Sequence, residues 1–276
     1  MIKRLEDDRV FLEYGPIRMT IDILIKKHRQ PEIAFIVGSY VVEEFNETCK
    51  YMPIIKGRAQ INMPVQNYPI PVQKMLAAVN RVGDKSLTPL AAVAGAFSDV
   101  ALEKALDIGA ERVIINNGGD IAFKDLKRRP IKVGIPISKD NSSSVLTLLL
   151  SDEKIGGICT SGLGGRSFTK GIATAAVAIA ENAALADACA TYLGNKTNVE
   201  DPKIVRCFAE EIDSETDIPG QLITLKAEYL SKKAVYSALL NGVEAAEDMC
   251  KRNIISGAVL CIEEEIVSVP SDINIL

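Results

Sequence analysis

The chain contains no tryptophan, and its 7 tyrosines and 7 phenylalanines offer few rings on which nucleic-acid bases could stack. Its net charge is −4, so it also lacks the basic field that attracts nucleic acid. Charged residues make up 25% and hydrophobic residues 47%, as in an ordinary globular protein. We therefore expect no nucleic-acid partner.

Histidine is almost absent, since His28 is the only one, and no Cys-x-x-Cys pair occurs. This pattern argues against a structural zinc site and against a disulfide framework. The N-terminus lacks the apolar core of a signal peptide, and the longest apolar run, residues 172–180, is too short to span a membrane. We expect a reduced, cytoplasmic protein with no membrane partner. Its six cysteines are Cys49, Cys159, Cys189, Cys207, Cys250 and Cys261.

The order of predicted elements favours an α+β fold. β-branched alternation over residues 10–14 and 17–25, around Gly15 and Pro16, predicts a hairpin. Helices and strands then follow without a strict βαβ rhythm, which favours a mixed or antiparallel sheet with packed helices. We expect a single domain over residues 1–276, which can include an N-terminal hairpin subregion at 1–50. Further helices are predicted at 34–49, 72–82, 183–193, 200–211 and 230–252, and further strands at 112–115, 121–123, 131–137, 145–150, 156–160, 170–179 and 254–262.

One predicted helix has clear ends: Thr88 can cap it, Pro89 suits its first position and Gly109 suits its end. Residues 91–96 are nearly all small, so another backbone or a planar ligand can approach closely. We expect this helix to pack against the helix at 183–193.

Two polar features of these helices have ordinary interpretations. Asp99 and Glu103, one turn apart, are predicted to lie on the solvated side of their helix with Lys104. Asn182 is a suitable cap for the helix at 183–193, and Gly194 is expected to end it.

The stretch from Gly156 to Arg166 holds five glycines, two hydroxyl groups, a cysteine and an arginine. Glycines allow successive backbone N–H groups to converge on an anion, and an arginine can close the remaining side. This predicts a phosphate-binding loop, although a tight turn between a strand and the next element would have the same composition. The predicted ligand-binding residues of this loop are Thr160, Ser161, Gly162, Gly164 and Gly165, with Arg166 as the clamp.

Asp187 and Thr191 are spaced i, i+4, so on a helix their side chains lie on one face, one turn apart. A carboxylate and a hydroxyl placed in this way are hard oxygen ligands for a Mg²⁺ ion that keeps waters for a phosphate. The alternative is that both are polar groups of a helix interior satisfied locally, the threonine by a preceding carbonyl.

Cys159 ends a predicted strand just before the N–H groups of the glycine loop and near Arg166. Such surroundings lower the pKa of a thiol and favour a nucleophilic thiolate. The alternative is a buried, inert cysteine.

Three segments resemble the ApbE-like superfamily: residues 117–121, 159–162 and 187–191. The characterised members are FAD:protein FMN transferases, and this chain is most similar to a shorter ApbE-like branch found in archaea and bacteria. The resemblance implies an ApbE-like fold and Mg²⁺ held by Asp187 and Thr191. It also implies that the family's Gly-Gly-Asp turn falls at residues 118–120 and its Ala-Thr-Ser-Gly segment at 159–162. The residues of the turn assigned to the cofactor are Asn117, Gly118, Gly119 and Asp120.

The chain departs from the transferases at two places. Ala94 stands where their Ile-Ala-Lys-Gly segment has its lysine, and their His-Ile-Ile-Asp-Pro segment has no counterpart. Cys159 also replaces an alanine of the family.

Two hypotheses from different classes remain open. The first is a Mg²⁺-dependent enzyme that acts on FAD, FMN or another phosphorylated small molecule, with Arg166 and Cys159 as catalytic residues. The second is a thiol or persulfide carrier of sulfur assimilation that uses Cys159. A flavin-binding protein without turnover is a third interpretation. In each case we expect a homodimer, because the predicted helices are long and apolar, and a protein partner fits the transfer hypotheses.

Overall fold

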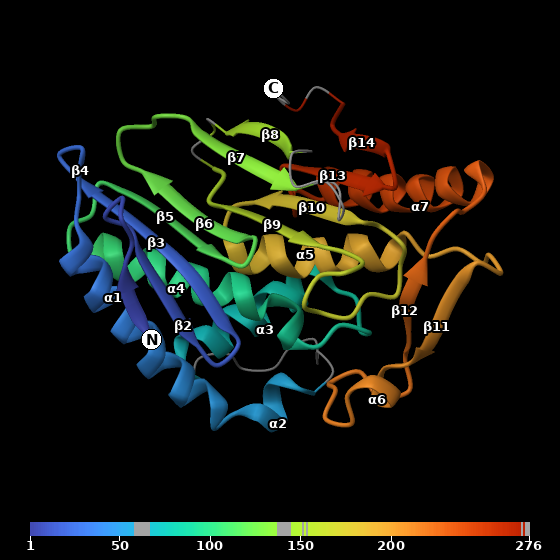
Figure 1. Ribbon diagram of the computed structural model, residues 1–276, viewed down its shortest axis with the longest axis horizontal. Coiled ribbons are helices and arrows are strands. Elements are labelled where there is room, and N and C mark those ends of the chain that lie inside the picture. Colours follow the sequence, from blue (N-terminus) through green and yellow to red (C-terminus); the bar gives the residue numbers. More distant parts are fainter. Residues whose placement is uncertain (58–66, 137–144, 151, 153, 272, 274–276) are drawn as a thin grey trace. The chain divides into compact units, whose positions relative to one another are not determined.

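The computed structural model covers the chain and describes all residues except 58–66, 137–144, 151, 153, 272 and 274–276 (Figure 1). The fold is α+β, as predicted, and the strand pairs whose register is defined are antiparallel. The helices are α1 (Pro31–Cys49), α2 (Met52–Ile55), α3 (Ile70–Val82), the 3₁₀ helix η1 (Pro89–Ala92), α4 (Val93–Asp107), α5 (Ala183–Lys196), α6 (Ala209–Ile212) and α7 (Lys232–Lys251). The strands are β1 (Ile2–Arg4), β2 (Val10–Tyr14), β3 (Ile17–Ile25), β4 (His28–Arg29), β5 (Arg112–Asn117), β6 (Asp120–Asp125), β7 (Ile131–Pro136), β8 (Val145–Leu150), β9 (Gly157–Ser161), β10 (Ala175–Ala180), β11 (Ile204–Phe208), β12 (Leu222–Ala227), β13 (Gly257–Ile262) and β14 (Glu265–Val269).

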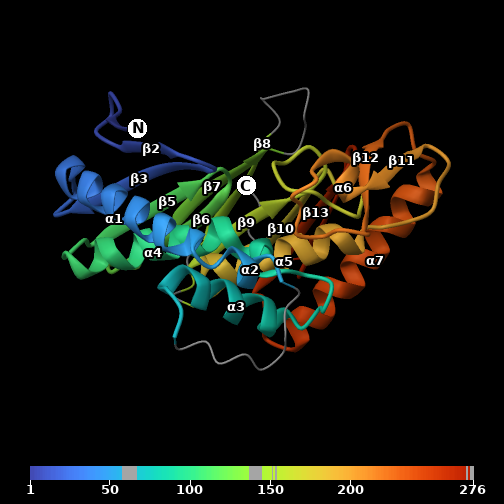
Figure 2. The same cartoon turned by 90° about the horizontal axis from the view of Figure 1, so that it is seen from below.

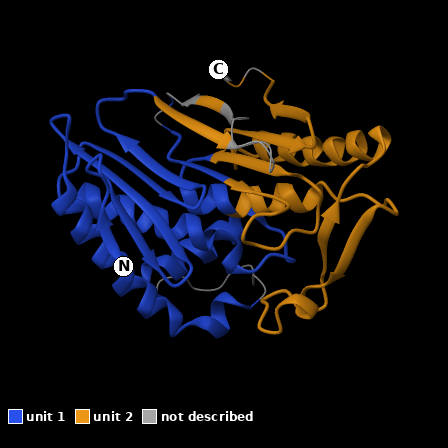
Figure 3. Ribbon diagram, in the orientation of Figure 1, with its two compact units in different colours: residues 1–130, 151–159, 180–187 blue, residues 131–150, 160–179, 188–276 orange. Residues whose placement is uncertain are grey.

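The chain divides into two compact units (Figure 3). Unit 1 consists of residues 1–130, 151–159 and 180–187, and unit 2 of residues 131–150, 160–179 and 188–276. The predicted single domain over residues 1–276 stays a prediction.

Unit 1 is built on an antiparallel sheet with the strand order β1-β2-β3-β5-β6-β9, and β4 pairs with β3. The predicted first hairpin is confirmed, because β2 and β3 pair with Tyr14 opposite Ile17. The hairpin of β5 and β6 is confirmed as well. In the pair formed by β6 and β9, Ile121 lies opposite Ile158.

The core of unit 1 lies between this sheet and helices α1 and α4, and α3 packs against these two helices (Figures 1 and 2). Leu12, Met19 and Ile21 alternate with more exposed residues along β2 and β3 and are fully buried. Helix α4 contacts α1, α3, β5 and β6. The prediction that Asp99 lies on a solvated side of this helix is wrong, since Asp99 is 2% exposed, whereas Glu103 is exposed as predicted.

The helix predicted from Thr88 onward is two helices. Ala92, with φ −125° and ψ 12°, interrupts the helical backbone, so η1 ends there and α4 begins at Val93. Pro89 lies in the first turn of η1, as expected, but the Thr88 side chain does not cap it. Gly109, with φ +100°, follows the end of α4.

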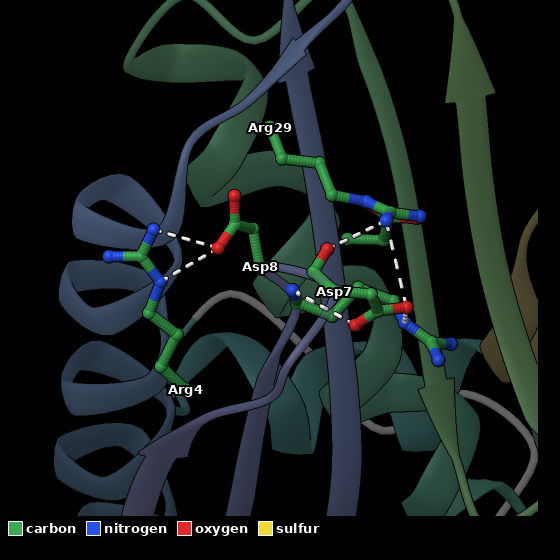
Figure 4. A network of polar contacts seen from close by, with 6 residues as sticks. Arg4, Asp7, Asp8 and Arg29 are labelled. Atoms are coloured by element: carbon green, nitrogen blue, oxygen red, sulfur yellow. Dashed lines mark hydrogen bonds and ion pairs between the residues drawn. The ribbon is translucent and has the colours of Figure 1, made fainter.

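Exposed ion pairs tie the N-terminal strands together (Figure 4). Arg4 donates to Asp8 at 2.9 and 2.7 Å, and Arg29 donates to the backbone oxygen of Asp7 at 2.7 Å. The basic run before Arg29 forms the turn between β3 and β4, with positive φ at Lys26 and Lys27. Pairs that water reaches contribute little stability, so we assign this network a local structural role.

Unit 2 contains β10-β13-β14, the hairpin of β7 and β8, and the pair β11-β12. Helix α7 contacts β13 and β14. The helix predicted over 200–211 is wrong at residues 204–208, which form β11 and pair with β12, and only the short α6 follows. The strand expected over 170–179 begins at Ala175. The loop expected between β7 and β8 at residues 140–144 lies outside the described residues.

Helix α5 begins as predicted, since the Asn182 side chain accepts the Leu185 N–H at 2.9 Å. It does not end at Gly194. A Cβ at Gly171 would lie 1.9 Å from the Gly194 oxygen, so Gly171 permits a loop to pack against the last turn of the helix. Among all helices in the described part of the chain, none is long and apolar enough to cross a membrane.

Candidate functional site

The Asp187 carboxylate is held at the N-terminus of α4. Its Oδ2 accepts the Gly95 N–H at 2.9 Å, and the Ala94 N–H also bonds to this carboxylate. These amides belong to the first turn of α4, where backbone N–H groups have no partner within the helix. Asp187, a residue of α5, therefore caps α4 and faces the positive end of its dipole.

Asp99 makes the reciprocal contact. Its Oδ1 accepts the Ala183 N–H and its Oδ2 the Ala184 N–H, both at 2.9 Å, and these are the first two amides of α5. Each helix thus supplies an aspartate that caps the other. The two helices meet closely, since a Cβ on Gly95 would lie 2.2 Å from the Ala183 oxygen. The predicted packing of these two helices through small residues is confirmed.

The predicted turn after β5 lies against the same helix end. Asn117 donates to the Ala94 oxygen at 3.2 Å and accepts the Arg18 N–H at 3.2 Å. The Ser98 hydroxyl donates to the backbone oxygen of Asp120 at 2.8 Å. Gly118 and Gly119 have φ of +71° and +110°, as the turn requires. These contacts fix Asp120 beside the start of α4.

Cys159 belongs to the same cluster, but its predicted low pKa is wrong. The side chain is fully buried and the thiol donates to the Ala183 oxygen at 3.2 Å. Burial raises its pKa well above the ordinary value, and the charges of Asp120, Asp187 and Asp99 raise it further. The expected nucleophilic thiolate is therefore replaced by a protonated thiol in an acidic environment.

We expect iodoacetamide at pH 7 to leave Cys159 unlabelled in the folded protein while Cys49, which is exposed, reacts. Mass spectrometry of the digested protein measures both. Unfolding in guanidinium before alkylation is the control and should make both cysteines reactive. Labelling of Cys159 at the rate of Cys49 in the folded chain contradicts the burial.

The carboxylates of this cluster disfavour each other's ionised form. Burial raises the pKa of Asp187 well above its ordinary value, and the neighbouring Asp120 raises it further. The Asp187 residue as a whole is half-buried. Burial likewise raises the pKa of Asp99 to about 6. Like charges at such a site are relieved by a proton or by a cation.

The pKa of Asp99 makes stability depend on pH. Its folded value of about 6 lies above its ordinary 3.8, so the folded chain binds more protons in this interval. The resulting stability is complete below the unfolded pKa and is lost as pH rises through about 6, and Asp187 acts in the same direction. Without divalent cations, we expect a higher Tm at pH 5 than at pH 7.5 by calorimetry. Asp99→Asn should reduce that difference, and an unchanged difference would contradict the assignment.

The remaining predicted residues belong to unit 2. In the glycine loop, Leu163 donates to the Ala173 oxygen at 2.7 Å and Gly165 to the Gly162 oxygen at 3.2 Å. A Cβ at Gly162 would lie 2.5 Å from the Thr174 oxygen, so this glycine serves a tight backbone contact. Roles for the loop residues in ligand binding stay predictions. Gly164, Gly165 and Arg166 are exposed, and Thr160, Ser161 and Thr191 are half-buried.

Thr197 anchors residues 172 and 173, the second of which accepts the Leu163 N–H of the glycine loop, and it was not predicted from the sequence. Its Oγ1 accepts the N–H groups of Ile172 and Ala173 at 3.1 and 3.0 Å, and the hydroxyl donates to the Gly194 oxygen at 2.7 Å. A lone threonine beyond a helix end carries no distinctive sequence signal. Asp99 was also missed, although Gly95, Ala96 and Leu102 around it on the helix indicated a buried face.

Within the described residues, no group of three or more His, Cys, Asp or Glu side chains is arranged to hold a metal ion. A cation at Asp187 would therefore take further ligands from a hydroxyl, from backbone, from water or from substrate.

The fold is that of a known class of enzymes. A structure of a variant of the flavin transferase ApbE from Vibrio cholerae covers 94% of this chain and 96% of its own length, with a TM-score of 0.50 and 11% identity. At this identity the likeness shows the fold alone.

Over residues 2–268 the chain matches the family described as AbpE bacteria, and it belongs to that family. It is similar to a "UPF0280 protein" of Methanothrix thermoacetophila, with 32% identity over 76% of this chain and 87% of the relative. A "UPF0280 protein" of Methanococcoides burtonii is 37% identical over 55% of this chain. That match spans 62% of the relative's length. The predicted ApbE-like resemblance is confirmed.

Proposed function

We propose that this chain is a Mg²⁺-dependent enzyme that acts on a flavin nucleotide, FAD or FMN, or on another phosphorylated substrate. Membership of the AbpE family and the flavin transferase fold support the substrate class. The observation that carries the proposal is the Asp187 carboxylate, placed with Asp120 at the start of α4.

The residues present suit a hard divalent cation. Buried carboxylates with raised pKa values hold negative charge at an energetic cost that a cation would offset. We assign the metal to the Asp187 carboxylate and to the hydroxyl of Thr191, one turn further along α5. When bound, Mg²⁺ would neutralise charge on phosphate oxygens.

The other predicted residues take roles in binding. Backbone N–H groups of residues 117–120 and of the glycine loop are proposed to bind phosphate and flavin, and Arg166 to bind a phosphate oxygen. With FAD as substrate, an oxygen nucleophile such as water would form a bond to the FMN phosphorus. The P–O bond to AMP would break, and AMP would leave with the bridging oxygen.

The resemblance implies that Ala94 stands in place of the transferases' lysine and that their His segment has no counterpart. We therefore propose a flavin nucleotide as the substrate and assign no acceptor. The sulfur-carrier alternative has no support, because Cys159 is buried and its thiol pKa is raised. A homodimer, a protein acceptor and a cytoplasmic location stay predictions.

The test uses the purified full chain with FAD, with MgCl₂ in one sample and EDTA in the other. Chromatography measures FMN and AMP, and flavin fluorescence measures binding. We expect FAD to bind more tightly with Mg²⁺ and FMN to accumulate only when Mg²⁺ is present. FAD binding without products would identify a flavin-binding protein without turnover. If FAD, FMN and ADP all fail to bind in the presence of Mg²⁺, the proposed function is wrong.

A further inference from the structure

Asp99 has no role in the proposed chemistry, yet it is a buried acid with both oxygens engaged. It lies on α4, is 2% exposed, and accepts the first two amides of α5 at 2.9 Å each. One turn later on α5, the Asp187 carboxylate accepts the Gly95 N–H of α4 at 2.9 Å. Asp99 and Asp187 therefore form a reciprocal cap, in which two helices are joined through each other's N-terminal amides.

We propose that Asp99 is a positioning residue for Asp187, fixing where the carboxylate of the proposed metal ligand stands. This inference rests on the proposed function only in naming Asp187 as the ligand. Helix α4 packs against the sheet and against its neighbouring helices, so the backbone that carries Asp99 is held in place. Two hydrogen bonds from adjacent amides to Asp99 fix the position of the first turn of α5 relative to α4, both along the helix axis and in rotation about it. Because a helix is rigid over one turn, they also set the position of Asp187.

Helix formation alone does not require Asp99. The helix already has a cap from its own chain, since Asn182 accepts the Leu185 N–H at 2.9 Å. A buried carboxylate is costly, and charged groups that face Asp99 oppose each other: Lys74 of α3 favours its ionised form and Glu103 of α4 disfavours it. What Asp99 adds is the registration of α5 against α4, at the point where Gly95 and Ala183 leave no spare space.

The test compares Asp99→Asn with Asn182→Ala. Both variants loosen the start of α5, but only the first removes a contact to α4. Asp99→Ser, which keeps a capping hydroxyl, is made in parallel so that a folded variant is available. Residue-resolved amide hydrogen exchange reports the Gly95 N–H, whose partner is Asp187. Calorimetric titration with MgCl₂ alone reports the metal site.

We expect Asp99→Asn to speed exchange at Gly95 as well as at Ala183 and Ala184, and to weaken Mg²⁺ binding about tenfold or more, as for loss of an outer-sphere partner. Asn182→Ala should speed exchange at Leu185, leave Gly95 protected and keep Mg²⁺ affinity within about twofold. If Asp99→Asn speeds exchange only at Ala183 and Ala184, Asp99 is a local cap and the inference is overturned. If the unaltered chain binds no Mg²⁺, the metal proposal fails by itself, and exchange at Gly95 still decides the role of Asp99.

Discussion

Replacing Gly95 with alanine is expected to destabilise the protein by about 3 kcal/mol or more, at or beyond the upper end of the usual range for overpacking. The added Cβ would lie 2.2 Å from the Ala183 oxygen and 2.5 Å from its carbonyl carbon. Both atoms are backbone, so no flexible side chain can move aside. In an open helix the same change would stabilise by up to about 1 kcal/mol, since alanine has the higher helix propensity. In Gly95→Ala the steric clash outweighs the gain in helix propensity, so the free energy of unfolding decreases.

The matched control is Gly38→Ala in α1. Gly38 is also buried within a helix, but the nearest atom to its added Cβ is the end of the Ile2 side chain at 3.4 Å, an ordinary contact. We expect this variant to be neutral or slightly stabilised. Urea unfolding followed by circular dichroism measures both. Equal stabilities for the two variants would show that α4 and α5 are not in close contact.

Gly95→Ala has a second expected effect, on the site. Separation of the two helices would lengthen the hydrogen bond from Gly95 to Asp187, now 2.9 Å. Mg²⁺ affinity should therefore fall together with stability in this variant and remain unchanged in Gly38→Ala.

Elements with local signals could be predicted from the sequence. The hairpin at Gly15 and Pro16 follows from strand alternation and a two-residue turn, and it forms with Tyr14 opposite Ile17. Asn182 caps α5 because a cap depends on the residues just beside it. The turn after β5 needs positive φ at Gly118 and Gly119, which the sequence of the turn itself indicates.

Features that depend on distant segments were missed. The strand β11 at residues 204–208 was missed although Ile204, Val205 and Phe208 are strand-forming residues, and it is completed by pairing with β12. The pKa of Cys159 was predicted from the amides that follow it. It is governed instead by burial and by Asp120, Asp187 and Asp99, which come from other elements. Asp99 was assigned to a solvated side with Glu103, although Gly95 and Leu102 beside it on the helix favour a buried face. The helices and strands that cover this face come from other parts of the chain.

Replacing Asp187 with asparagine separates metal binding from folding. The asparagine keeps an oxygen that can accept the Gly95 N–H, but it carries no charge. Because burial and Asp120 raise the pKa of Asp187, the ionised carboxylate opposes folding at neutral pH. In buffer with a chelator, we therefore expect Asp187→Asn to be as stable as the unaltered chain or more stable at pH 7.5. Such a gain of stability on loss of a site group is common at functional positions.

With Mg²⁺ the order should reverse. At a concentration about 100 times its Kd, Mg²⁺ should stabilise the unaltered chain by about 2.7 kcal/mol. Asp187→Asn should lose nearly all of this, since its Mg²⁺ affinity is expected to fall by about 100-fold or more. Asp107→Asn makes the same charge change on the exposed end of α4 and should retain the Mg²⁺ effect. Thermal unfolding with MgCl₂ or EDTA measures all three proteins. If Mg²⁺ stabilises Asp187→Asn as much as the unaltered chain, Asp187 is a cap of α4 and no metal ligand.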